Sequence, residues 1–136
     1  MDARLQALLD RRGGLAIRRE MLSVVPPWTL QGGCRAGRMV RVLPGIYVDA
    51  ALVREAEPSL PLLARVGPEI ARRASLAYAG GRAALSRLTA LDVWGLRRQP
   101  PDEPLYLDLP RGAACGTAPN SWCATGPTSR WRHRTR

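Results

Sequence analysis

The sequence predicts a mainly α-helical protein that carries a small β wing, and three patterns lead to this fold class. Apolar residues recur at helical spacing over 3–12 and over 18–25. Over 39–50, β-branched residues alternate with other side chains around a central proline-glycine pair, which favours a hairpin turn. The range 111–136 holds five arginines, no acidic residue and no period, so we expect a disordered basic tail.

The region 1–50 contains the elements of one small domain. The expected elements are a helix over 3–12, a short strand over 15–17, a helix over 18–25, a helix over 28–38 and a hairpin over 39–50. Gly13-Gly14 ends the first helix. Pro26-Pro27 ends the second, because proline cannot continue a helix and disfavours the helical conformation before itself.

The third helix, expected over 28–38, has a mixed pattern. Gly32-Gly33 lies in its middle, and each glycine costs about 1 kcal/mol relative to alanine in a helix. Intrinsic propensity therefore does not hold this helix together. We expect packing through Trp28 and Leu30 to do so.

A second, helical region is expected over 51–110. It comprises a linker over 51–61, a helix over 68–79, a helix for which Ser86 is the N-cap, and a strand over 105–109. On the helix after Ser86 we expect Leu88, Leu91 and Trp94 to point inward. The alternative is that Leu91 and Trp94 anchor an exposed face for a partner or a second copy.

The charge of the chain favours a polyanionic partner. All 21 basic residues are arginine, the acids number 11, and the net charge is +10. The planar guanidinium group donates two hydrogen bonds to a phosphate at once. The alternative is a solvated surface whose arginine content reflects GC-rich codons.

The order helix, strand, helix, turn, helix, hairpin is that of a winged helix-turn-helix, whose third helix enters the major groove while the wing touches adjacent DNA. The candidate DNA-binding residues are Gln31, Arg35, Arg38, Arg41, Arg18 and Arg19. Gln31, Arg35 and Arg38 share one face of the expected helix, where glutamine suits adenine and arginine suits guanine. The other three arginines are expected phosphate contacts. For each arginine, a phosphate contact alone or a solvated position is the alternative.

Residues 4–50 resemble the N-terminal domain of the AbiEi family, the antitoxin half of an abortive-infection toxin–antitoxin system. The matching stretches are 5–14, 15–20 and 39–48, and residues 82–96 resemble the next segment of many relatives. The chain departs from the family at Arg87, where histidine is expected, and at Gly32-Gly33. The resemblance implies a repressor of its own operon with a cognate toxin as a possible partner. Relatives with a further C-terminal domain lead us to expect a truncated or frame-altered end after residue 110.

Catalysis, metals and cofactors are not expected. Asp102, Glu103 and Asp108 lack the lysine that a restriction-like nuclease uses, and the single histidine, His133, lies in the tail. The cysteines at 34, 115 and 123 lack zinc-site spacing. With neither a signal peptide nor a membrane span expected, we predict a cytoplasmic protein without catalytic activity. The element order and the charge predict binding to double-stranded DNA, and the resemblance implies that the protein is a repressor. A homo-oligomer on DNA, a protein-interaction winged helix and a remnant of a larger nuclease-like protein remain open.

Overall fold

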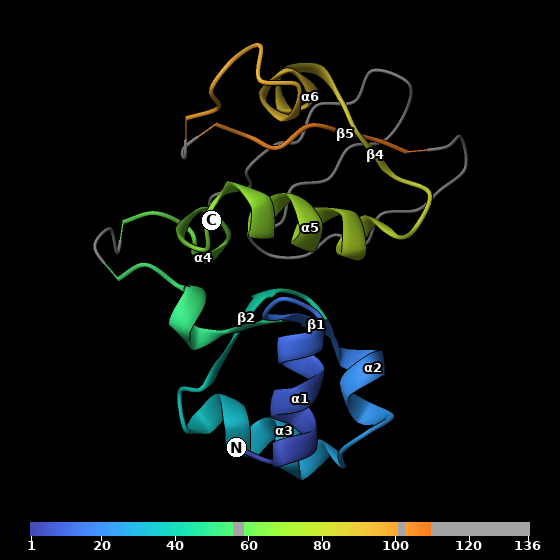
Figure 1. Cartoon of the computed structure of the whole chain (residues 1–136), viewed down its shortest axis with the longest axis vertical. Helices are drawn as coiled ribbons and strands as arrows, with labels where there is room; N and C mark the ends of the chain where they lie inside the picture. Colours follow the sequence, from blue (N-terminus) through green and yellow to red (C-terminus); the bar gives the residue numbers. More distant parts are fainter. Residues whose placement is uncertain (56–58, 101–102, 110–136) are drawn as a thin grey trace.

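The computed structural model describes residues 1–55, 59–100 and 103–109, which form helical layers on either side of a small antiparallel sheet (Figure 1). In chain order the elements are α1 (Ala3–Arg11), β1 (Leu15–Ile17), α2 (Arg18–Leu22), α3 (Pro27–Arg35), β2 (Met39–Leu43), β3 (Ile46–Asp49), the 3₁₀ helix η1 (Ala50–Leu52), α4 (Leu62–Arg65), α5 (Pro68–Ala79), β4 (Ala84–Leu85), α6 (Arg87–Val93) and β5 (Leu107–Asp108). Helices with a small β component are thus confirmed. The tail predicted over 111–136 lies outside the described residues.

Helix α1 forms for reasons that its sequence contains. The Asp2 carboxylate accepts a hydrogen bond from the Arg4 backbone N–H at 2.8 Å and so satisfies one of the free N–H groups at the helix start. Its three buried side chains are Leu5, Leu8 and Leu9. After the helix, Gly14 adopts a φ of 81°, and a Cβ there would collide with the side chain of Leu52. The predicted glycine stop is therefore also a point of close packing.

The main sheet has the strand order β1-β3-β2, and both pairings are antiparallel. Tyr47 on the central strand pairs with Ala16 on one side and with Arg41 on the other. One face of the sheet packs on the first three helices. The core on this face consists of Leu5, Leu8, Leu9, Ala16, Met21, Val25, Leu30, Met39 and Tyr47.

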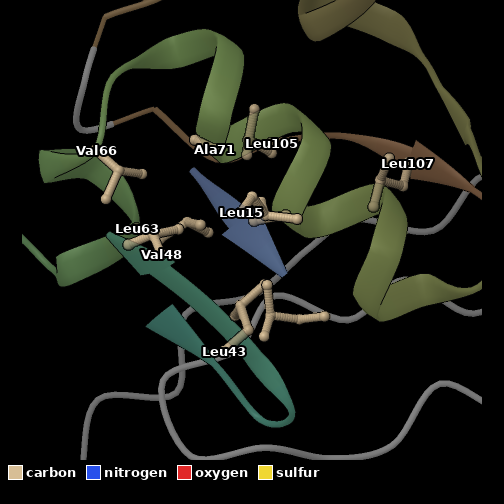
Figure 2. Close-up of a cluster of buried hydrophobic side chains, with 10 residues drawn as sticks. Leu15, Leu43, Val48, Leu63, Val66, Ala71, Leu105 and Leu107 are labelled. Carbon is tan, nitrogen blue, oxygen red and sulfur yellow. The ribbon is translucent and has the colours of Figure 1, made fainter. Parts of the chain in front are cut away.

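The other face of the same sheet is covered by the second helical region. Its core consists of Leu15, Leu43, Ile46, Val48, Leu63, Val66, Ala71, Ala74, Leu105 and Leu107. Figure 2 shows Leu15 and Val48 of the sheet facing Ala71 and Leu105 of the second region. The strands of the first fifty residues thus pack against two helical layers. Residues on both sides of position 50 contribute to the same core.

The second region follows the predicted order of elements in part. The helix predicted over 68–79 is present as α5, but the predicted strand over 105–109 shrinks to the two residues of β5. Helix α4 forms next to the segment expected to be a linker. Helix α6 is tied to its neighbours by an Arg72–Asp92 ion pair at 2.6 Å and by the fully buried Thr89 hydroxyl, which accepts from the Tyr106 N–H at 2.8 Å.

These polar contacts correct the predicted orientation of α6. Thr89 and Asp92 point toward the interior, where their partners Tyr106 and Arg72 lie. Leu91 and Trp94 therefore point outward, and Trp94 is 79% exposed. Ser86 occupies the N-cap position, but its hydroxyl makes no capping hydrogen bond. Leu88 is half-buried. The predicted inward positions of Leu91 and Trp94 are therefore wrong.

Helix α2 is shorter than the predicted range 18–25. It ends at Leu22, and the Ser23 hydroxyl donates to the Glu20 carbonyl oxygen at 2.7 Å just beyond that end. Val25 directly precedes a proline, which disfavours the helical conformation there. Val25 is nevertheless buried, as its apolar character predicts.

Candidate nucleic-acid interface

Helix α3 presents one exposed face and one buried face. Gln31 and Arg35 are exposed and lie four residues apart, on the same side of the helix. Leu30 and Gly33 form the buried side. A Cβ at Gly33 would lie 2.8 Å from the Cε atom of Met39, so this glycine lets the helix sit directly on β2. Packing holds the helix across its glycine pair, as predicted for Leu30.

Trp28, the other predicted packing anchor, does not contribute to that packing. Its side chain is 72% exposed. Pro27 occupies the first helical position and fixes where the helix begins, so the register places Trp28 on the outward side with Gln31 and Arg35. The sequence contained the signal for this position, since residues 28, 31 and 35 follow helical spacing.

Arg38 lies beyond α3, which corrects the prediction that it shares a helix face with Arg35. The helix ends at Arg35 because Gly37 adopts a φ of 68°. The Gly37 N–H then donates to the Cys34 carbonyl and the Arg38 N–H donates to the Gly33 carbonyl, each at 3.1 Å. This pair of bonds is a Schellman motif, and it fixes the backbone that carries the exposed Arg38 side chain.

Arg41 is exposed on β2, which is an edge strand of the sheet. It lies close enough to α3 for its charge to act on Cys34. Burial raises the pKa of the Cys34 thiol, and the Arg41 guanidinium acts in the opposite direction. The structure therefore brings the end of α3, Arg38 and the start of β2 together as one basic segment.

This proximity predicts a change in thiol reactivity. In a protein with Cys115 and Cys123 replaced by serine, Arg41→Ala is expected to slow alkylation of Cys34 at pH 8. Without Arg41 the thiol pKa rises further, and less of the reactive thiolate is present. Iodoacetamide labelling followed by mass spectrometry measures the rate, with Arg18→Ala as the control. Equal rates in the wild type and the Arg41→Ala variant would contradict the placement of Arg41.

Arg18 and Arg19 lie elsewhere, at the start of α2. Both are exposed, and the Arg18 N–H donates to the Gly45 carbonyl at 2.8 Å. They line an open hollow of about 690 Å³ between the hairpin turn and α5, which contributes Ala77 and Tyr78. The six predicted residues therefore form two groups. One follows α3 into β2, and the other flanks the hairpin turn.

Among the residues that the structure describes, the five predicted arginines form no ion pair. Within residues 1–55, 59–100 and 103–109, the carboxylate partners belong to other arginines, in the pairs Arg12–Glu20, Arg72–Asp92 and Arg97–Glu103. The segment 21–48 contains Arg35, Arg38 and Arg41 and no acidic residue at all. A surface of this kind attracts a polyanion.

Several residues were considered in the sequence as metal ligands or catalytic groups. Glu103, considered as a metal ligand, instead forms two hydrogen bonds with Arg97, and the described residues hold no cluster of three or more metal-ligating side chains. Asp108 is exposed on β5. Asp102, Cys115, Cys123 and His133 lie outside the described residues. Across the described part of the chain, every helix is too short or too polar to cross a bilayer.

A patch of exposed apolar side chains lies at the end of α6. It comprises Leu91, Val93, Trp94 and Leu96. Two of them, Trp94 and Leu96, are more than 70% exposed. From the sequence, Leu91 and Trp94 are predicted to point inward, and partner contacts are the alternative.

Comparison with protein-family models, with curated proteins and with solved structures returned no match.

Proposed function

We propose that this protein is a non-catalytic, DNA-binding transcriptional repressor of antitoxin type. The observation that carries the proposal is the exposed side of α3, where Gln31 and Arg35 are followed by Arg38 and Arg41 in a segment free of acidic residues. Glutamine and arginine are the side chains that read adenine and guanine in the major groove. Arginine also binds phosphate through two parallel hydrogen bonds.

The topology supports a winged helix-turn-helix as the DNA-binding module. The order α1, β1, α2, α3, β2, β3, with the sheet order β1-β3-β2, places a helix directly before a two-stranded hairpin. In such modules the helix before the hairpin reads the groove. The resemblance of residues 4–50 to the AbiEi family leads us to propose a toxin–antitoxin operon as the biological setting, with its toxin as a further partner.

The expected result is salt-dependent binding to double-stranded DNA. The probe is a fluorescent duplex that the protein itself selects from a random-sequence library, and anisotropy is followed from 50 to 400 mM salt. If the five predicted arginines each neutralise one phosphate, the slope of log K against log salt is about −4.5. Absence of binding at low salt, or a slope near zero, would overturn the proposal.

A second candidate function is protein interaction, which the exposed patch at the end of α6 favours. Trp94 and Leu91 would anchor a partner or a second copy of the chain. An apolar interface of this kind responds weakly to salt, so the same titration separates the two functions. Trp94→Ala is then expected to lower the oligomeric mass, measured by light scattering, and to leave the salt slope unchanged.

A further inference from the structure

The exposed face of α3 contains two residues for which the fold itself offers no reason. Trp28, in the first turn, is 72% exposed, and no hydrogen bond links its indole N–H to the described residues. An exposed tryptophan leaves a large apolar ring in water. The ring adds nothing to either core, because neither cluster of buried side chains includes it.

Gly32 is the second such residue. It lies between Gln31 and Gly33, inside helix α3. Glycine in a helix costs about 1 kcal/mol relative to alanine. Gly33 has a packing reason, since a Cβ there would meet Met39 at 2.8 Å. At Gly32 a Cβ would meet no atom within 4 Å, and the backbone does not have a positive φ. An alanine would therefore fit at Gly32 and stabilise the helix.

Together these residues give the outward face of α3 a particular shape and chemistry. Trp28, Gln31, Gly32 and Arg35 follow the spacing i, i+3, i+4, i+7 and share this face. The absence of a side chain at Gly32 lets the helix backbone approach a partner closely. The same face offers an apolar ring at one end and a guanidinium group at the other.

Among the groups on the edges of base pairs in the major groove, the thymine C5-methyl is the apolar one. An apolar indole ring beside groove-reading side chains matches that methyl group. We propose that Trp28 is a specificity-determining residue that packs on a thymine methyl, and that Gly32 admits the base edge between Trp28 and Arg35. This inference rests on the proposed DNA-binding function and names the base chemistry that it selects.

The test replaces thymines of the selected duplex by deoxyuridine, one position at a time, which removes only the methyl group. Wild-type protein is expected to lose about fourfold in affinity at one or two positions, the value of one buried methyl group. Trp28→Ala is expected to bind the unmodified duplex more weakly and to lose this sensitivity. Trp94→Ala, which removes another exposed tryptophan just beyond the end of α6, is the matched control and should keep the wild-type deoxyuridine sensitivity.

Gly32→Leu is an independent test of the same inference. The open space at that position leaves the fold intact, while the new side chain blocks the close approach of the helix to DNA. Its expected loss of DNA affinity is about tenfold, with an unchanged circular dichroism spectrum. The inference is overturned if Trp28→Ala keeps the wild-type affinity, if it keeps the deoxyuridine sensitivity, or if it changes the oligomeric mass alone. Failure of the wild type to bind any duplex would instead overturn the proposed function itself.

Discussion

Replacing Arg35, Arg38 and Arg41 together by alanine is expected to reduce DNA affinity about 100-fold or more at low salt. Each lost contact to a base or a phosphate is worth about 1 kcal/mol or more, and three such contacts multiply to this factor. The salt slope should fall by up to about 2.7, the value reached if all three arginines neutralise phosphates, because those contacts no longer release counterions. Anisotropy titrations at several salt concentrations measure both quantities.

A variant with three other arginines replaced controls for the loss of net charge. Arg54, Arg82 and Arg98 are also exposed, and they belong to the second region. Arg54→Ala/Arg82→Ala/Arg98→Ala removes the same charge away from α3 and β2. Equal weakening of DNA binding in the two triple variants would show that net charge, and not the segment from Arg35 to Arg41, drives binding.

Gly33→Leu is expected to destabilise the fold by about 3 kcal/mol. The new side chain would enter the space of Met39, which is 2% exposed, and would push α3 off β2. Small domains have a total free energy of unfolding of about 5–15 kcal/mol, so such a loss lowers the melting temperature by more than about 10 °C. Thermal unfolding followed by circular dichroism measures the change.

Gly32→Ala is the matched variant on the opposite side of the same helix. It is expected to raise stability by up to about 1 kcal/mol, because alanine favours the helix and the position is open. If the two substitutions shifted the melting temperature in the same direction, the orientation of α3 would be incorrect.

Much of the candidate site follows from local sequence. Helical spacing placed Gln31 and Arg35 on one face, and alternation around Pro44-Gly45 predicted the two strands that are observed as β2 and β3. These features depend on a few neighbouring residues, so they can be predicted from the sequence without knowledge of the tertiary structure. The exposure of Arg41 belongs to the same class, since it lies between half-buried valines on an edge strand.

Positions at element ends were harder to predict. The sequence predicts Arg38 on the third helix, because a sequence pattern does not show at which residue a helix closes its last hydrogen bonds. Trp28 is predicted as a packing contact of the third helix, and Trp94 is predicted to point inward from its spacing with Leu88 and Leu91. Their outward positions depend on Pro27 and on the partners of Thr89 and Asp92, which lie on other elements.

The sequence by itself determined the helix and hairpin order of the first fifty residues, the excess of arginine, and the segment 21–48 without acidic residues. It did so because periodicity, turn residues and charge are local properties. Only the tertiary structure decided that β1 and β3 contribute side chains to two cores. Leu15 and Val48 belong to the core on one face of the sheet, and Ala16 and Tyr47 belong to the core on the other. It also separated Gly33, which packing requires, from Gly32, which packing leaves open. That distinction depends on which helix face meets β2, and contacts between distant segments set that face.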